Sequence, residues 1–250
     1  MVSSEFSGIF ISLVRFVVGA LLSLMGIIIL RKNLKVHNKF AVSMRAFLGT
    51  VAMVLYYVAI KYSGSGRATL YNTTYPIFVA IFSALLFKEK LKINNFISIA
   101  LCIVGVYFVL YDGSRTDIRG DILGILSGVI GGLSYAYSKR ARETDHTLNI
   151  YMWICLCGVS MTFYTAGEVN RIEPFSIIIL ISSAITVFLA QVFITYGTKF
   201  VAVVKGSIIS FFRIPITMGL SLVFLGETFK FKFIIGTLFI LSGLIINRRQ

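Results

Sequence analysis

The sequence predicts an all-α integral membrane helical bundle with nine transmembrane helices. Three observations predict this fold class: long apolar stretches, short and mostly basic loops between them, and an unusually apolar composition. Hydrophobic residues make up 57% of the 250 residues and charged residues only 14%. A globular domain carries about 45–50% apolar and about 25% charged residues. Because the loops leave no room for a folded aqueous domain, we expect one membrane domain.

The apolar stretches approach the length that a bilayer requires. A hydrocarbon core about 30 Å thick is crossed by about 20 residues of helix, and the shorter stretches reach this length once their flanks are counted. A soluble protein of this size would bury roughly two or three such helices, so segment length argues against a soluble helical domain. In chain order the predicted helices are Phe6–Leu30, Phe40–Ile60, Ala68–Phe87, Phe96–Tyr111, Ile122–Tyr137, Ile150–Gly167, Phe175–Thr195, Ser207–Leu225 and Phe233–Ile246.

The basic residues of the loops predict the orientation of the chain. Alternate loops hold fifteen and seven Lys or Arg residues, and the richer side is predicted to be cytoplasmic. The C-terminus is then inside and the N-terminus of this chain outside. Arg15 and Arg213 fall within predicted helices, and Arg15 is close enough to its helix start to reach the outer interface. The richer set is Arg31, Lys32, Lys35, Lys39, Arg45, Lys88, Lys90, Lys92, Lys139, Arg140, Arg142, Lys199, Lys205, Arg248 and Arg249, and the other set is Lys61, Arg67, Arg115, Arg119, Arg171, Lys230 and Lys232.

The two halves of the chain resemble each other at an offset of 138 residues. They define a first repeat at residues 1–112 with four helices and a second at residues 119–250 with five. Five helices per repeat reverse the second copy, so we expect an inverted repeat in which the first helix is missing. Either the protein has nine helices or that helix lies upstream of Met1. The matched pairs are Lys61 with Lys199, Arg67 with Lys205, Glu89 with Glu227, Lys92 with Lys230, Gly105 with Gly243 and, one residue out of step, Pro76 with Pro215.

Each repeat also carries a polar stripe within an apolar helix. Its members recur every three residues, which places them on one helix face. Polar stripes on equivalent helices are typical of a central site between inverted repeats. Ser and Thr alone are explained by hydrogen bonds to their own helix, but that explanation does not cover an amide or a guanidinium. The stripes are Thr69, Asn72 and Tyr75 in the first repeat and Ser207, Ser210 and Arg213 in the second.

Short motifs accompany the stripes. The motifs of the first half are Arg15, A-I-K-Y at Ala59–Tyr62, Y-P-I-F at Tyr75–Phe78, F-K-E-K-L at Phe87–Leu91 and I-V-G-V around Gly105. The motifs of the second half are T-K-F at Thr198–Phe200, I-P-I-T at Ile214–Thr217, L-G-E-T at Leu225–Thr228 and L-S-G-L around Gly243. In these motifs the chain resembles the EamA-type transporters of the drug/metabolite transporter superfamily. The resemblance implies ten-helix inverted-repeat carriers of small metabolites, often amino acids, in the cell inner membrane. The chain departs from this pattern by its missing first helix and by Lys88, where a Gly usually precedes Glu89.

Arg213 is the residue that most strongly indicates a binding site. A charge at the bilayer centre costs about 2.5–3.5 kcal/mol on insertion scales. All ten Asp and Glu residues fall in loops or at helix ends. A guanidinium without a carboxylate at its own depth suits an anionic group on a substrate. The alternative is that Arg213 binds backbone carbonyls that Pro215 leaves unpaired.

Six residues in total are predicted to line a substrate pathway. Besides the two stripes, Tyr135 adds a phenol from another helix, and Gln191 forms a polar pair with Thr195. Each uncharged member has the alternative role of a hydrogen bond between helices, which is worth about 0.6 kcal/mol on average. Gly124, Gly128 and Gly132 form two G-x-x-x-G steps, which favour close helix packing. The predicted pathway residues are Asn72, Tyr75, Tyr135, Gln191, Ser210 and Arg213.

The sequence indicates no catalytic activity. It contains no nucleophile–base pair, metal cluster or phosphate loop, so we expect no catalytic residue, metal or cofactor, and hence no enzyme. The net charge of +14 is spread over short loops and not along an exposed helix, which argues against nucleic acid as a partner.

The predicted function is a multi-pass membrane transporter that moves a small metabolite, an amino acid or similar solute, or a drug-like compound by alternating access. Its partners are then a small-molecule substrate and the lipid bilayer. The alternative is a non-transporting truncated paralogue, or a membrane subunit that needs a partner helix. The sequence leaves open whether the protein forms a homodimer.

Overall fold

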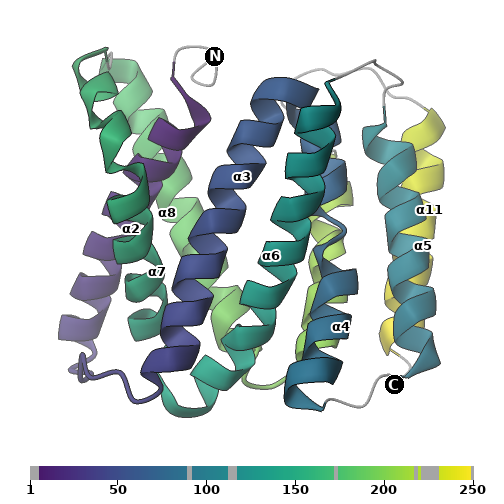
Figure 1. The fold of residues 1–250 in the computed structure, drawn as a ribbon, viewed down its shortest axis with the longest axis horizontal. Coiled ribbons are helices and arrows are strands. Elements are labelled where there is room, and N and C mark those ends of the chain that lie inside the picture. Colours follow the sequence, from purple (N-terminus) through teal and green to yellow (C-terminus); the bar gives the residue numbers. More distant parts are fainter. Residues whose placement is uncertain are drawn as a thin grey trace. The chain divides into compact units, whose positions relative to one another are not determined.

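The computed structural model describes residues 6–88, 92–111, 117–171, 174–216, 219–220 and 231–248. Every regular element in these ranges is helical, which confirms the all-α prediction (Figure 1). Residues 213–216 are helical as well. The α-helices are α2 (Gly8–Ile29), α3 (Lys39–Asn72), α4 (Tyr75–Phe87), α5 (Ile93–Leu110), α6 (Ile118–Thr144), α7 (Thr147–Thr162), α8 (Pro174–Gly197), α9 (Val203–Ile209) and α11 (Phe231–Arg248), and the 3₁₀ helices are η1 (Phe163–Arg171) and η2 (Ser210–Phe212).

Several of the described helices are long and apolar enough to cross a bilayer. Two more apolar helices, Tyr75–Phe87 and Phe231–Asn247, are shorter. The count of nine helices stays a prediction, because residues 221–230 lie outside the described ranges. The five segments of sufficient length among the described residues are Gly8–Ile29, Lys39–Asn72, Ile93–Leu110, Thr147–Val169 and Ser176–Gly197.

Helix α3 consists of two helices joined at Gly64. The sequence predicted separate helices at Phe40–Ile60 and Ala68–Phe87, and the backbone leaves the helical conformation between them at Gly64, with φ 75° and ψ 163°. Glycine adopts this conformation because it has no Cβ to clash with the backbone. A second interruption, which the sequence did not predict, lies between Asn72 and the start of α4.

The chain divides into two compact units. Unit 1 comprises Met1–Tyr57 and Ser134–Val201, and unit 2 comprises Val58–Leu133 and Ala202–Gln250. Each unit takes segments from both predicted repeats, so the units cut across the division at residues 1–112 and 119–250. Helices α3 and α6 each contribute residues to both units.

In unit 1, α2 packs against α7 through a core of buried apolar side chains that includes Phe16, Ile150 and Ile154. Glycines allow the two helices to approach. A β-carbon built on Gly158 would lie 2.5 Å from the Phe16 ring, and one on Gly19 would lie 2.9 Å from the Cys155 sulfur. Both separations are shorter than van der Waals contact, so a larger residue at either glycine would push the helices apart.

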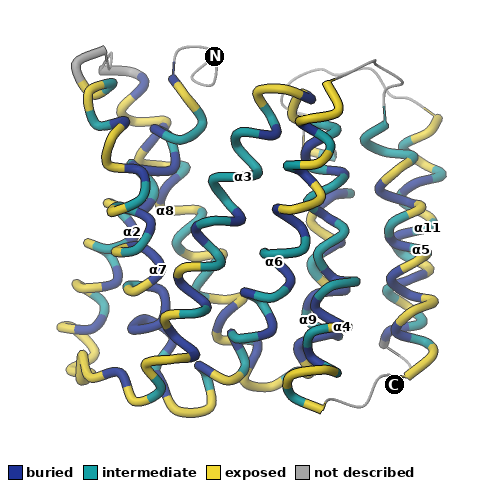
Figure 2. The backbone as a smooth tube through the Cα atoms, in the orientation of Figure 1, coloured by how far each residue is buried: buried dark blue, intermediate teal, exposed yellow. Residues whose placement is uncertain are grey.

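In unit 2, α5 packs against α11, and Figure 2 shows buried residues along both helices. A β-carbon built on Gly105 would lie 2.5 Å from the carbonyl oxygen of Gly236 and 2.7 Å from the Ile240 side chain. One built on Gly243 would lie 2.7 Å from the Cys102 sulfur. Later residues of α5 thus meet earlier residues of α11, which means that the two helices run antiparallel.

Unit 2 also contains the first half of α6, which covers the end of α3 and the start of α4. β-Carbons built on Gly124, Gly128 and Gly132 would lie 2.9 Å from the Tyr71 side chain, 2.9 Å from the Thr74 hydroxyl and 2.6 Å from the Phe78 side chain, respectively. The predicted close packing of the two G-x-x-x-G steps is therefore confirmed.

Candidate functional site

The polar residues of the first stripe lie where the chain breaks between α3 and α4. Helix α3 ends at Asn72 and α4 begins at Tyr75, with Pro76 in its first turn. The Thr73 and Thr74 hydroxyls donate to the carbonyls of Leu70 and Tyr71, respectively. Because Pro76 has no N–H, the α-helical hydrogen bond to the Asn72 carbonyl cannot form. Asn72 and Tyr75 are the helix residues on either side of this break.

Asn72 is half-buried, and its side-chain nitrogen donates to the Ser127 hydroxyl of α6 at 3.0 Å. Ser127 in turn donates to the Gly124 carbonyl at 2.6 Å. The amide oxygen of Asn72 accepts no hydrogen bond from the residues that the structure describes. Asn72 therefore keeps an acceptor that a substrate could use. The sequence did not predict Ser127 as a partner, although its place between Gly124 and Gly128 puts it on the packed side of α6.

Tyr75 joins the two polar stripes. Its hydroxyl contacts the Ser210 hydroxyl and lies 3.5 Å from the Ser207 carbonyl oxygen. Ser210 itself donates to the Ser207 carbonyl at 2.6 Å. All three residues belong to unit 2. The structure thus brings together a member of the first stripe and two members of the second, which are more than 130 residues apart in the chain.

Arg213 lies three residues after Ser210 in the chain. It begins the helical residues 213–216, is exposed, and its backbone N–H donates to the Ser210 carbonyl. In the segment that carries the second stripe, α9 tightens into the 3₁₀ helix η2 at Ser210, and the backbone stays helical through Arg213. Four of the six predicted pathway residues, Asn72, Tyr75, Ser210 and Arg213, therefore belong to unit 2.

The other two predicted residues belong to unit 1. Tyr135 lies in the second half of α6 and Gln191 in α8, and both side chains are half-buried. Gln191 lies two helical turns after Ser183, about 80° around the helix.

Ser183 belongs to a polar cluster that sequence reasoning missed. The Arg15 guanidinium donates to the Tyr57 hydroxyl at 2.9 Å and twice to the Ser183 hydroxyl, at 3.1 and 3.2 Å. The sequence allowed Arg15 of α2 to reach the outer interface, and the structure shows its guanidinium bound to Tyr57 of α3 and Ser183 of α8. Two neutral hydroxyls are its hydrogen-bond partners among the described residues. No sequence signal links these positions, because Tyr57 and Ser183 lie 42 and 168 residues away from Arg15.

A second arginine of α3 forms an ion pair in unit 2. The Arg67 guanidinium donates to both carboxylate oxygens of Asp121, at 3.0 and 2.8 Å, and the Ser63 hydroxyl donates to the same carboxylate. The two-pronged geometry is the strong form of an arginine–carboxylate pair. It fixes the start of α6 on α3.

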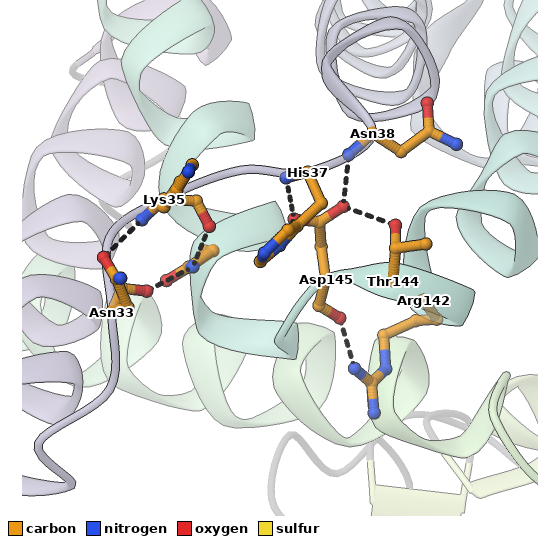
Figure 3. A network of polar contacts seen from close by, with 8 residues as sticks. Asn33, Lys35, His37, Asn38, Arg142, Thr144 and Asp145 are labelled. Carbon is orange, nitrogen blue, oxygen red and sulfur yellow. Dashed lines mark hydrogen bonds and ion pairs between the residues drawn. The ribbon is translucent and has the colours of Figure 1, made fainter.

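In unit 1, Asp145 lies between α6 and α7 and anchors the α2–α3 connection (Figure 3). Its carboxylate accepts the backbone N–H groups of His37 at 2.6 Å and Asn38 at 2.9 Å, and the Thr144 hydroxyl at 2.7 Å. Burial by itself raises the pKa of Asp145, but the hydrogen bonds from Asn38 and His37 outweigh this effect and hold the pKa below its ordinary value of 3.8. This network is structural and lies apart from the polar stripes in the sequence.

A comparison with protein families identifies the chain. A model described as the EamA-like transporter family matches residues 1–111 and 118–249. The chain belongs to the EamA-like transporter family.

Curated relatives of this EamA-like protein have transporter names. An "Uncharacterized transporter" of Helicobacter pylori is 31% identical over 218 residues, which cover 81% of this chain and 71% of the relative. A protein of the same description from Archaeoglobus fulgidus is 25% identical over 210 residues, covering 82% of this chain and 75% of the relative. Family and relatives together support a multi-pass membrane transporter and point to transport, not to catalysis.

A solved crystal structure of another protein has the same fold as this EamA-like chain. The two superpose with a TM-score of 0.84 at 16% sequence identity, over 98% of this chain and 90% of the other. At this identity the likeness concerns the fold alone.

Proposed function

We propose that this protein is a carrier that moves a small metabolite across the cytoplasmic membrane by alternating access. The contact between Tyr75 and the serines of the second stripe carries the proposal, because it joins polar side chains of the two repeats. The first stripe lies at the break between α3 and α4. Broken helices with polar side chains inside a bilayer are typical of transporter binding sites, since backbone groups there are available to a ligand.

The contacts between α5 and α11 support an inverted repeat. At the 138-residue offset, Gly243, Ile240 and Gly236 are the counterparts of Gly105, Cys102 and Ser98. Gly105 meets the counterparts of Cys102 and Ser98, and the counterpart of Gly105 meets Cys102 and Ser98 themselves. A two-fold axis makes contacts reciprocal in this way. Because the helices run antiparallel, the axis implied is perpendicular to them, and the two repeats would have opposite orientations.

The pair α2 and α7 supports the same arrangement in unit 1. Phe16 meets Gly158, the counterpart of Ala20, and Gly19 meets Cys155, the counterpart of Val17. The later residue of one helix again meets the earlier residue of its counterpart. In the proposed mechanism, one set of elements rocks against the other and exposes the site to each side in turn.

The residues proposed to contact the substrate are Asn72, Tyr75, Tyr135, Gln191, Ser210 and Arg213. Arg213 would bind an anionic group of the substrate, for which a guanidinium is well suited. Asn72 would bind a polar group through its amide oxygen. These groups together favour a carboxylate-bearing solute such as an amino acid. The proposed location is the inner membrane with the C-terminus in the cytoplasm, as the loop charges predict.

A ligand screen followed by transport tests this function. A metabolite that binds the folded state raises the thermal stability of the purified protein with concentration. The metabolite so found is then used for uptake into proteoliposomes. Arg213→Ala should weaken uptake about tenfold or more, which corresponds to roughly 1.4 kcal/mol. Arg140→Ala, which changes an exposed arginine in the last turns of α6, should leave uptake unchanged. Full uptake with unchanged affinity in Arg213→Ala would remove this residue from the site.

A further inference from the structure

Three basic side chains of unit 1 come together at the start of α7. Arg142 lies in the last turn of α6, His146 is the N-cap of α7, and Lys32 follows the end of α2. Burial lowers the pKa of His146 from its ordinary value of 6.5, and the charges of Arg142 and Lys32 lower it further. Only nearby charges have this effect, because the interaction weakens with distance. We call Lys32, Arg142 and His146 the cationic cluster.

Arg142 is held in place without a carboxylate. Its Nη1 atom donates to the backbone carbonyl of Asp145, and its guanidinium lies 5.9 Å from the centre of the Tyr196 ring. The Asp145 carboxylate lies on the other side of that residue, where it accepts hydrogen bonds from the α2–α3 connection (Figure 3). Among the residues that the structure describes, Arg142 has no ion pair, and its Nε atom has no acceptor. Its charge is therefore available to an anion.

The other two members of the cluster are held by the backbone around them. The side-chain nitrogen of Asn149 donates to the Asn33 carbonyl at 2.8 Å and so fixes the chain beside Lys32. Lys32 is exposed, and its ammonium has no partner within the described ranges. His146 accepts the Leu148 N–H at its Nδ1 atom, at 3.3 Å. The neutral His146 ring then carries its proton on Nε2, which can donate to a ligand.

The cluster thus offers positive charge and hydrogen-bond donors. It lies at the N-terminus of α7, where the helix dipole adds a partial positive charge. Thr147, the first residue of α7, is 3% exposed, and its hydroxyl finds no partner in the described part of the chain. Arginine, lysine and a helix N-terminus together are a favourable environment for the oxygens of a phosphate group.

We propose that the cationic cluster binds the phosphate of an anionic phospholipid headgroup. Apolar side chains adjoin the cluster on two sides, since Ile29 in the last turn of α2 is 67% exposed and Phe200, just after α8, is 65% exposed. A lipid with its phosphate at Lys32 can lay its acyl chains along these side chains. Basic pockets between the ends of membrane helices are typical sites for acidic headgroups.

A free phosphate fits the cluster less well. It meets the same charges but has no acyl chains to cover Ile29 and Phe200, so it gains nothing from the apolar surface. The proposal does not rest on transport. Lipid binding at the cluster can hold or fail whether or not the protein carries a solute.

Thermal unfolding of the purified chain in a neutral detergent tests the proposal. A ligand that binds the folded state raises the unfolding temperature with its concentration. Phosphatidylglycerol, phosphatidylcholine and inorganic phosphate are added in separate titrations. We expect phosphatidylglycerol to stabilise the chain at concentrations about tenfold lower than the other two, which corresponds to roughly 1.4 kcal/mol. Phosphatidylcholine is the matched lipid, because its own ammonium offsets the charge of its phosphate.

Two lysine substitutions show whether the cluster is the site. Lys32→Ala should weaken the effect of phosphatidylglycerol about fivefold, as expected for one basic residue at an anionic surface, and Lys32→Arg should preserve it. Lys39→Ala should have no effect, because Lys39 is equally exposed at the start of α3 but does not act on His146. Unfolding without lipid shows first that each variant is folded.

Three results would overturn the proposal. Equal stabilisation by the two lipids would show that the headgroup charge is not recognised. Equal stabilisation by inorganic phosphate and phosphatidylglycerol would make a soluble anion the ligand. Equal losses in Lys32→Ala and Lys39→Ala would mean that the lipid responds to the total charge of the chain and not to this cluster.

Discussion

At the scale of single residues, Asp145 makes a prediction about pH. A carboxyl whose folded pKa is depressed contributes stability above its unfolded pKa and loses that contribution as the pH falls through the folded value. The pKa of Asp145 lies below 3.8 in the folded chain. The contribution of Asp145 should therefore be fully present near neutral pH and should disappear only below about pH 4.

Asp145→Asn should lower the stability of unit 1 at neutral pH by about 1.5–3 kcal/mol, since the substitution removes a charged acceptor from buried N–H groups. The measurement is thermal unfolding in detergent between pH 3 and pH 8. The difference in thermal stability between the native chain and Asp145→Asn should become smaller toward pH 3. The matched control is Glu143→Gln, because Glu143 makes only an exposed ion pair with Arg140, which is worth little. Equal effects of the two substitutions would contradict the assignment.

Arg15 leads to a second prediction, which compares two adjacent serines. Ser183 accepts two hydrogen bonds from Arg15, whereas Ser182 is exposed and donates to the Ile178 carbonyl of its own helix. Ser183→Ala should lower thermal stability by about 0.5–1.5 kcal/mol because a half-buried guanidinium loses an acceptor. Ser182→Ala should have almost no effect. A larger loss in Ser182→Ala would mean that Arg15 does not depend on Ser183.

The residues that could be predicted from the sequence are those whose signal is local. Asn72, Tyr75 and Ser210 stand out because polar side chains recur at helical spacing inside apolar runs, and the structure brings Tyr75 and Ser210 into contact. The partners of Arg15 could not be predicted, because Tyr57 and Ser183 come from other helices and carry no mark in the sequence. Long-range pairing depends on packing, which one sequence does not reveal.

At the scale of elements, the glycines of α6 predict how closely it must approach α3. A β-carbon on Gly128 would lie 2.9 Å from the Thr74 hydroxyl and 3.0 Å from the Tyr71 carbonyl oxygen. Gly128→Ala should therefore destabilise the protein by about 1–3 kcal/mol through overpacking. Gly197→Ala, at a position with open space around it, should be neutral. Thermal unfolding of the two variants measures the difference, and equal melting temperatures would argue against close packing at Gly128.

The helices themselves were predictable where apolar runs are long, as in α2 and α5. The sequence also placed a loop between residues 61 and 67, and the backbone leaves the helical conformation there at Gly64. The further break after Asn72 was not predicted, although Pro76 marks it, because proline has no N–H for a helical hydrogen bond.

At the scale of the whole molecule, the loop charges predict which side each loop faces. Cysteines placed at Lys35 and Lys139 should react with a membrane-impermeant thiol reagent only when the cytoplasmic face is exposed, as in inside-out vesicles. A cysteine placed at Arg119 should react in the opposite preparation. Variants would start from a chain without Cys102, Cys155 and Cys157, which are the native cysteines. The same sidedness for residues 35 and 119 would contradict the predicted topology.

The sequence predicted two repeats but not the two units. An offset of 138 residues is visible in matched residues such as Gly105 and Gly243. Which repeat elements pack together is set by contacts such as that of Gly105 with Gly236, and these are invisible in a single sequence. The structure pairs two elements with their counterparts from the other repeat, α5 with α11 and α2 with α7.

The passage of α3 and α6 through both units has a mechanical consequence. The unit boundary falls between Tyr57 and Val58 in one helix and between Leu133 and Ser134 in the other, and both helices are continuous there. Any rotation of one unit against the other must bend or unwind α3 and α6 at these positions. Gly131 and Gly132 lie immediately before the second boundary, where glycine lowers the resistance of a helix to bending. The bending stiffness of α3 and α6 at the unit boundary would then limit the rate of such a rotation.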